Sequence, residues 1–331
     1  MSDGVLWGPS RADRTRQHGD LSLGMNLDPI SFDQLRVVLA VVETGSFTAA
    51  SKRLRRAQSA VSQAVMNLEA QLGVALFDRS AYRPRLTPAG ETLVAEIRTI
   101  VERGEFLRSQ ARAIAAGLEP ELRIVLDAVW PMGAFATVLS EFRTRFPTVG
   151  IRLHVEALGG VVEKVMDGTC DLGVLATMPE LPAGLIGRTL RPVLMIPVAA
   201  PSHPLAGHTG RIPKVKLHDQ VQIVLTDRSR LTAGRDFWVL SPRTWRVADL
   251  SSKRELLKAG LGWGSMPRHM VADDLSSGAL RRIEIEGMPE TDLLPAFAFH
   301  RADGVPGIAG RWMLDRLAGG VPDPHAAFTG S

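Results

Sequence analysis

The stretch from residue 46 to residue 87 constrains this chain more than any other segment. Its apolar spacing predicts a short helix over about 48–54, a tight turn, and a second helix that begins near Gln58 or Ser59. The apolar side chains that the second helix would bury are Val61, Val65, Leu68 and Leu72. Two helices joined in this way, with small polar residues on the outer face, are suited to the major groove of DNA.

The outer face predicted for the second helix can read bases. Amide and hydroxyl side chains both donate and accept hydrogen bonds at base edges, and glutamine or asparagine can bridge adenine. The residues predicted to bind DNA from this pair of helices are Thr48, Gln58, Ser59, Ser62, Gln63 and Asn67. The alternative is an ordinary surface helix with solvated polar residues.

Positive charge is concentrated in the same segment. The whole chain has a net charge of +4, and residues 46–87 hold seven lysines and arginines against two acidic residues. Cations beside a base-reading helix bind phosphate whatever the sequence. Tyr82-Arg-Pro-Arg then predicts a wing with a stiff tip, and Arg79, Arg83 and Arg85 complete the predicted DNA-binding set.

Residues 32–90 resemble the winged helix-turn-helix of LysR-type transcriptional regulators. The matching positions are 47–50, 54, 58–62, 68–69, 72–73, 76–77, 79 and 86–90. The sequence departs from the family pattern at Ala57, Gln63 and Tyr82. These differences alter the expected base preference and the expected contact of the wing with DNA, but not the fold. The resemblance implies that Gln58 and Ser62 touch bases and that Arg79 supports the wing.

From Glu91 to Ala116 the sequence predicts one uninterrupted helix, ended by Gly117 and Pro120. Its heptad seam consists of Leu93, Ile97, Ile100, Gly104, Leu107, Ala111 and Ile114. The seam must pack either on the chain's own core or on another helix. The resemblance implies a paired linker helix in a homodimer, with dimers joining into tetramers, and Gly104 would allow close approach.

Beyond residue 118, strands and helices alternate, which favours parallel-rich α/β sheets. We expect strands at 122–126, 150–155, 171–175, 194–198, 221–225 and 245–248 and helices at 132–146, 161–167, 255–259 and 308–317. Ser252 and Glu255 would form a capping box for the third of these helices. The chain would enter a second lobe near residue 199 and return near residue 295, which leaves a cleft between two lobes. The resemblance continues here and implies an effector-binding domain of periplasmic-binding-protein type.

Strand ends and helix N-termini would line that cleft. The residues predicted to bind the effector are Ala128, Val129, Trp130, Gly159, Thr177, Thr226, Asp227, Asp249 and Trp263. Many relatives have a hydroxyl residue where Ala128 and Val129 stand, so a carboxylate held by serine or threonine hydroxyls is disfavoured. The two tryptophans would either stack on a flat or apolar ligand or belong to the core.

The predicted fold class is α/β with an N-terminal all-α winged helix-turn-helix, a long linker helix and a two-lobed α/β effector-binding domain. The expected boundaries are a disordered extension at 1–25, the DNA-binding head at 26–88, the linker at 89–117 and the effector domain at 118–331. Within the effector domain, lobe I would comprise about 122–198 and 295–320, and lobe II about 199–294.

These expectations indicate a sequence-specific DNA-binding regulator controlled by a small molecule. The alternatives are a solute-binding protein or an enzyme built on the same two-lobed module. No export signal supports the first, and Gly260-Leu-Gly-Trp-Gly is no dinucleotide fingerprint, because it follows a helix. The expected partners are double-stranded DNA, an effector, further copies of the chain and RNA polymerase.

Several further features are expected to be absent. His203 and His208 lie in a Pro/Gly loop without metal-ligand partners at suitable spacing, so we expect no metal and no cofactor. No apolar run is long enough to span a bilayer. Cys170 is the one cysteine, which indicates a reducing, cytoplasmic location and a packed, inert thiol.

Overall fold

The computed structural model describes residues 30–80, 84–226, 229, 231, 238–289 and 292–319. The chain divides into two compact units, residues 1–105 and residues 106–331, and each is described by itself. The predicted extension at residues 1–25 lies outside the described residues, as do Arg83 and Asp227. Where the chain is described, no helix is both long and apolar enough to cross a membrane.

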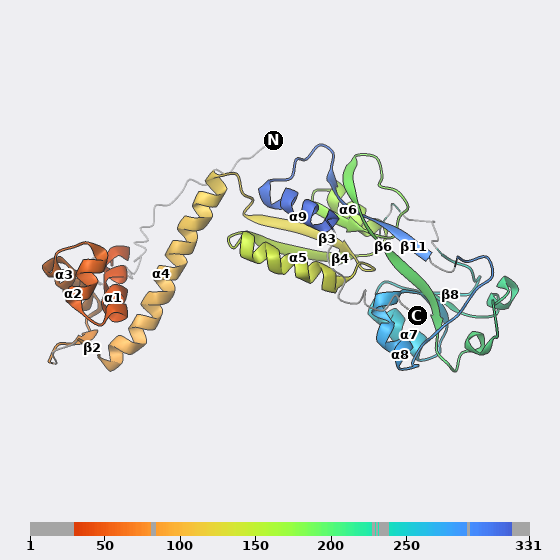
Figure 1. The fold of residues 1–331 in the computed structure, drawn as a ribbon, viewed down its shortest axis with the longest axis horizontal. Helices are drawn as coiled ribbons and strands as arrows, with labels where there is room; N and C mark the ends of the chain where they lie inside the picture. Colours follow the sequence, from red (N-terminus) through yellow and green to blue (C-terminus); the bar gives the residue numbers. More distant parts are fainter. Residues whose placement is uncertain are drawn as a thin grey trace, which may run out of the picture. The chain divides into compact units, whose positions relative to one another are not determined.

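The first unit is built on three short helices whose ends are set by local sequence (Figure 1). They are α1 (Phe32–Thr44), α2 (Phe47–Leu54) and α3 (Gln58–Leu72), and α2 and the start of α3 lie close to their predicted positions. Ser31 and Gln34 form a capping box at the start of α1, and Gly45 ends that helix in the left-handed conformation. Arg55 ends α2 at a φ of 55°, which few side chains other than glycine adopt, and this residue makes the tight turn before α3.

A short antiparallel hairpin follows α3. Its strands are β1 (Phe77–Asp78) and β2 (Arg85–Leu86). The apolar faces of the three helices meet in one core, which the buried Leu76 and Phe77 extend to the base of the hairpin. The core therefore fixes α3 from one side only and leaves the opposite side of that helix at the surface.

The helix α4 (Pro88–Ala115) shows two kinds of burial along its length. Near its start Val94 and Ile97 are buried in the core of the first unit. Further along, the seam residues Ile100, Leu107 and Ile114 are 50%, 65% and 51% exposed. The predicted seam thus splits into a part that packs on its own chain and a part that is exposed in the single chain.

Gly104 has a different role from the one that the sequence suggested. A Cβ at this position would lie 2.3 Å from Cε2 of the Phe32 ring. The close approach at Gly104 is therefore made by a side chain of the same polypeptide.

The second unit combines strands with helices around one mixed sheet. Its strands are β3 (Glu121–Asp127), β4 (Gly150–Glu156), β5 (Leu172–Leu175), β6 (Leu185–Ala199), β7 (Gln222–Leu225), β8 (Thr244–Val247), β9 (Trp263–Pro267), β10 (Arg281–Arg282) and β11 (Asp292–Arg301). Its α-helices are α5 (Met132–Arg145), α6 (Gly159–Met166), α7 (Leu250–Lys258), α8 (Ala272–Ser276) and α9 (Ile308–Ala318). The strand order is β4-β3-β5-β11-β6-β9-β7-β8, with β10 beside β6.

The sheet has parallel ends and an antiparallel middle. β3 pairs in parallel with β4 and β5, and β7 pairs in parallel with β8 and β9. The pairs β5–β11, β6–β11 and β6–β9 are antiparallel. The expected parallel arrangement therefore holds among β3, β4 and β5 and among β7, β8 and β9, whereas the pairings of β6, β10 and β11 are antiparallel.

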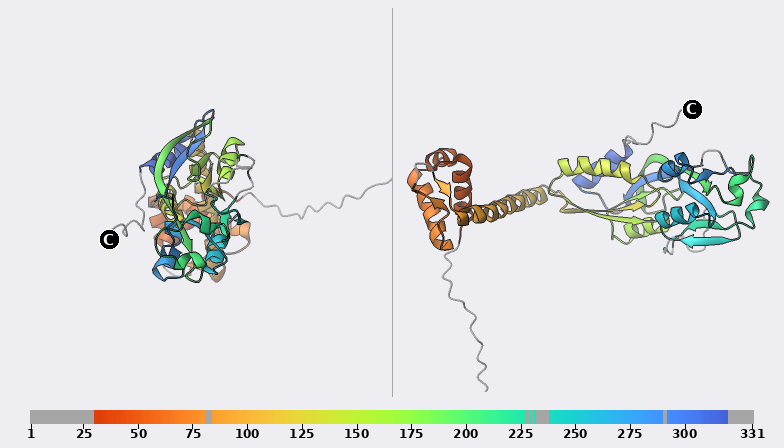
Figure 2. Two further views of the ribbon diagram at one scale, coloured as in Figure 1. Left: turned by 90° about the vertical axis from the view of Figure 1, so that its right-hand side faces the viewer. Right: turned by 90° about the horizontal axis from the view of Figure 1, so that it is seen from below.

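Two long strands, β6 and β11, make this connection and lie side by side (Figure 2, long green and blue strands). Their register runs from Asp292 opposite Met195 to Arg301 opposite Leu185. It shifts between Leu294 and Ala296, at Pro295. These strands contain the two predicted crossings between the lobes.

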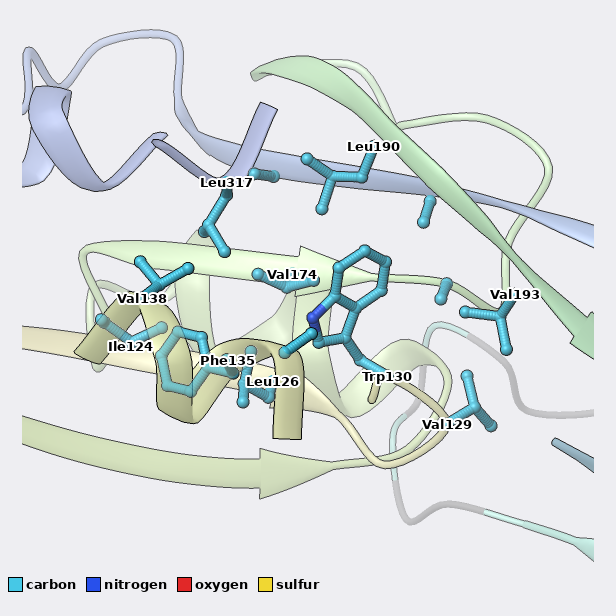
Figure 3. Close-up of a cluster of buried hydrophobic side chains, with 14 of the residues drawn as sticks. Ile124, Leu126, Val129, Trp130, Phe135, Val138, Val174, Leu190, Val193 and Leu317 are labelled. Carbon is cyan, nitrogen blue, oxygen red and sulfur yellow. The ribbon is translucent and has the colours of Figure 1, made fainter. Parts of the chain in front are cut away.

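Both tryptophans predicted for the cleft belong to cores. The Trp130 ring lies among Val174, Leu190 and Val193 in the main core (Figure 3). Trp263 is 0% exposed and packs in a separate cluster with residues such as Leu205 and Ile212. This packing favours the second of the two alternatives, that the tryptophans belong to the core, while contact of either ring with an effector stays a prediction.

The helix predicted at 255–259 begins five residues earlier. α7 starts at Leu250, and the Asp249 side chain accepts a hydrogen bond from the backbone N of Ser252 at 2.6 Å. The predicted Ser252/Glu255 capping box is therefore wrong, because Asp249 takes the N-cap position. This contact also lowers the pKa of the Asp249 carboxyl.

Candidate functional site

The outer face of α3 is polar, uncharged and accessible. Val61, Val65 and Leu68 are fully buried, which fixes the rotation of the helix about its axis. The opposite face contains the exposed Gln58, Ser59, Gln63 and Asn67 and the half-buried Ser62, and Thr48 is exposed on α2. Gln63 Nε2 donates to Asn67 Oδ1 at 2.7 Å, so these two amides are held together on the surface.

Several arginines of the predicted basic cluster are paired with acids. Arg53 NH1 lies 2.7 Å from Glu43 Oε2, and Arg56 bonds both carboxylate oxygens of Asp33 at 2.6 and 2.9 Å. These acids belong to α1 and lie outside the 46–87 window in which the charge was counted. In the described part of the chain, Lys52, Arg55 and Arg85 have no ion pair within 4.0 Å. Among the described residues, fewer cations of this segment are therefore free of an ion pair than the sequence count indicated.

Glu69 on α3 holds the start of the wing. Its Oε1 accepts from the backbone N of Leu76 at 2.8 Å and of Phe77 at 3.0 Å, and its Oε2 pairs with Arg79 NH2 at 2.9 Å. The Arg79 guanidinium also lies 5.5 Å from the centre of the Phe47 ring. These contacts place Arg79 as a support between the wing and α2–α3, while its contact with DNA stays a prediction.

Thr87 and Gly90 fix the far end of the wing to α4. The Thr87 hydroxyl donates to Ala75 O at 2.7 Å, and Gly90 N donates to Thr87 Oγ1 at 2.9 Å. A Cβ on Gly90 would lie only 2.1 Å from Leu76 O, so only glycine lets the helix approach so closely. The exposed Arg85 on β2 stands beside this junction.

A second candidate site is a small cavity in the second unit. One side is formed by Val129, Leu158 and Thr177, which follow β3, β4 and β5. The other side is formed by residues of β7, α7 and β9, among them Gln222, Lys253 and Ser265. Met195 of β6 and Asp292 and Leu294 of β11 also line it. The cavity volume is about 60 Å³.

A buried carboxylate organises the first side of this cavity. Asp127 Oδ2 accepts from Ala176 N at 3.0 Å and from the Thr177 hydroxyl at 2.6 Å, while Oδ1 accepts from Val129 N at 3.2 Å. These bonds join the carboxyl ends of β3 and β5. Because the Thr177 proton is donated to Asp127, Thr177 offers an incoming ligand only acceptor capacity.

Leu158 shows local backbone strain at the same place. It precedes α6 with φ 51° and ψ −127°, a conformation in which a Cβ is unfavourable. Its side chain is buried and lines the cavity. Strain at a ligand-facing residue persists only where surrounding packing enforces it.

The predicted effector residues meet this cavity only in part. Val129 and Thr177 line it. Ala128, Gly159, Thr226 and Asp249 are described but are not among its lining residues, and Asp227 lies outside the described residues. Trp130 and Trp263 are core residues, as noted above.

Sequence reasoning missed Lys253 and Asp292. Lys253 is 5% exposed, and its Nζ donates to Ser265 O at 2.8 Å. Burial lowers its pKa to about 8. Asp292 is 6% exposed, its Oδ2 has no hydrogen-bond partner, and burial raises the pKa of its carboxyl. No signal in the sequence pointed to either residue, and only the structure shows that Gly264 leaves room for Lys253, since a Cβ there would lie 3.1 Å from Lys253 Cε.

Metal-type and thiol chemistry find little support in the described residues. No group of three or more His, Cys, Asp or Glu side chains that could hold a metal ion occurs among them. The Cys170 thiol is buried, and burial raises its pKa to about 11, so the reactive thiolate is disfavoured.

Comparison with known proteins gives matches over both units. The model of the bacterial regulatory helix-turn-helix protein, lysR family, matches residues 32–91, and that of the LysR substrate binding domain matches residues 115–321. The chain is 32% identical over 291 residues to the probable HTH-type transcriptional regulator YhaJ of Escherichia coli K12, covering 87% of this chain and 96% of YhaJ. It is 32% identical to the regulator PunR of the same strain, covering 86% and 91%.

A solved structure shares the fold. It is an OxyR C206 mutant of Corynebacterium glutamicum, with a TM-score of 0.51 and 22% identity. The match covers 88% of this chain and 92% of that one. At this identity the likeness concerns the fold alone.

Proposed function

The chain belongs to the LysR family of transcriptional regulators, and we propose that it reads its operator through the outer face of α3 and responds to a molecule bound in the cavity of the second unit. It is a DNA-binding regulator with an effector-binding domain, so the alternatives of a solute-binding protein or an enzyme are not supported. We further propose that it acts without turnover, in the cytoplasm. The boundaries proposed are 26–88 for the head, 89–117 for the linker and 118–331 for the effector domain.

One observation carries the DNA-binding assignment. The α3 face that contains Gln58 and Ser62 is free of charged side chains. Lys52 on α2, Arg55 in the turn before α3 and Arg85 on β2 have no ion pair within 4.0 Å among the described residues. Uncharged polar groups discriminate bases, whereas unpaired cations bind phosphate. These two facts support base recognition by α3 and phosphate binding by the neighbouring cations.

Substitutions test these two roles, base recognition and phosphate binding. Ser62→Ala or Gln58→Ala would weaken operator binding by roughly 1–3 kcal/mol, with little effect on random duplex. Arg85→Ala would weaken both about equally and reduce the salt slope by about 1. Ser140→Ala and Arg143→Ala, at exposed positions on α5, serve as controls. The measurement is duplex affinity over a salt series, with the operator first found by genomic footprinting. Equal losses on both duplexes for all three variants would contradict the assignment.

The exposed part of α4 supports self-association. Ile100, Leu107 and Ile114 repeat every seventh residue, and Phe106 beside them is 49% exposed. Such a seam is suited to a second copy of the same helix. We propose a homodimer formed through α4, two of which join as a tetramer, and we keep contact with RNA polymerase as a prediction.

A further inference from the structure

The effector cavity contains one buried base and one buried acid that are not paired with each other. Lys253 comes from α7 and Asp292 from the start of β11, and both side chains line the cavity. Among the described residues, no ion pair within 4.0 Å joins them. Two ionisable groups that line one cavity without an ion pair between them are costly for the empty protein.

Lys253 has donor capacity that the described residues do not use. An ammonium group has three N–H donors, and the hydrogen bond found for Nζ in the described part of the chain goes to Ser265 O. The residue also lies near the N-terminus of α7, where the helix dipole disfavours a cation and favours an anion. An anionic group placed beside Nζ would satisfy both the spare donors and the helix end.

Asp292 has acceptor capacity that the protein does not use. Its Oδ2 is buried without a hydrogen-bond partner. Leu294 and Met195 lie close by in the lining and supply no donor. A ligand group with N–H donors would remove this deficit.

Two other polar side chains of the lining, those of Gln222 and Thr177, are already engaged. Gln222 donates to Trp238 O at 2.6 Å and accepts from the backbone N of Leu240 and Ser241 at 2.7 and 3.0 Å. The Thr177 proton is donated to Asp127. The groups with unused capacity therefore include one cation and one carboxylate, set in a lining of mainly aliphatic side chains.

We propose that the effector is a small zwitterion of the amino-acid type, whose carboxylate binds Lys253 and whose ammonium group binds Asp292. This inference rests on the proposed function, because it takes the cavity as the effector site. Ala128 and Val129 have no hydroxyl group to donate to a carboxylate, and Lys253 supplies N–H donors in their place. A cavity of about 60 Å³ restricts the ligand to a few non-hydrogen atoms unless the lobes separate.

The test compares probes that differ in one charged group. L-norvaline has both groups, pentanoate has only the carboxylate, and butylamine has only the ammonium; alanine, propanoate and ethylamine form a smaller set. Isothermal titration of the full chain with each set is expected to show the amino acid binding at least about 10-fold tighter than either partner compound. This comparison needs no variant. Equal affinity within both sets, or no binding of either amino acid at millimolar concentration, would overturn the proposal.

Variants identify the residues. In Lys253→Met the amino acid would bind no tighter than the amine, and in Asp292→Asn no tighter than the acid. Lys216→Met, which removes an exposed lysine outside the cavity, would keep the discrimination of the wild type. Unchanged discrimination in both charge variants would overturn the assignment of Lys253 and Asp292.

DNA binding by the same preparations distinguishes failure of this inference from failure of the proposed function. Salt-sensitive duplex binding together with no preference for zwitterions would overturn this inference and leave the proposed function standing. Absence of duplex binding under every condition would overturn the proposed function itself.

Discussion

Replacing Lys253 with methionine should stabilise the second unit. Burial lowers the pKa of Lys253 from 10.5 to about 8, which corresponds to about 3 kcal/mol of free energy for keeping the ammonium charged at neutral pH. Methionine is similar in length and has no charge to bury. It leaves Ser265 O without its donor, at a cost of about 1 kcal/mol. The net gain at pH 7 is about 2 kcal/mol, or a rise in Tm of about 4–8 °C for a domain of this size.

The effect has a defined dependence on pH. Because the pKa of the folded state lies below that of the unfolded state, the unfolded chain binds more protons between about pH 8 and 10.5. The wild type therefore gains stability over this window, and the penalty is fully present below it. The pKa of Asp292, the other ionisable group in the lining, is raised from 3.8, so its own penalty appears as pH rises from acid values. Lys253→Met should lack the alkaline gain while Asp292→Asn keeps it.

Urea unfolding followed by tryptophan fluorescence measures this effect. Apart from Trp7, the tryptophans belong to residues 106–331, so the signal reports on the second unit. Lys216→Met, at an exposed lysine, is the matched control and should change little. The reasoning is refuted if Lys253→Met is less stable than the wild type at pH 7. It is also refuted if the difference between the two proteins is the same at pH 7 and pH 10.

Three further substitutions test other parts of the structure. Gly90→Ala should destabilise the first unit by roughly 1–3 kcal/mol, because its Cβ would meet Leu76 O at 2.1 Å, and this outweighs a gain of about 1 kcal/mol in helix propensity. Thermal unfolding of the head should show a lower Tm, and an unchanged Tm would contradict the contact. Leu107→Glu should shift sedimentation equilibrium towards the monomer without lowering the free energy of unfolding of the second unit, and an unaltered mass would exclude α4 as the interface. Asp127→Asn should lower the free energy of unfolding of the second unit by roughly 1–3 kcal/mol, because an amide NH₂ would replace one of the carboxylate oxygens that accept from N–H and O–H donors. Urea unfolding that showed wild-type stability would disprove this role of Asp127.

The head was predictable from sequence because its determinants are local. Ser46, Gly45 and the spacing of Val61, Val65 and Leu68 fix helix ends and faces through contacts within a few residues. Charge pairing was less predictable, since Arg56 meets Asp33 across 23 positions. A count over one segment could not include that partner.

The cavity was mostly hidden from sequence reasoning because its lining comes from distant segments. Lys253 lies in a sequence that predicts an amphipathic helix with exposed cations. The structure buries it, with contacts to Ser265 and Gly264 of β9. Asp249 was predicted to touch a ligand, yet local competition made it the N-cap of α7. Trp263 is buried because its side of β9 faces the core of its own lobe.

The shift in register at Pro295 affects how the two lobes can move. Opposite Pro295 the partner strand contains Pro192, and neither residue has a backbone N–H to donate. The ribbon of β6 and β11 is therefore weakest against bending at one rung, with regular pairing on both sides of it. Leu294 lies next to that rung and also lines the cavity, as does Met195 close by on β6. An occupant of the cavity would therefore contact Leu294, the residue that precedes this irregular rung.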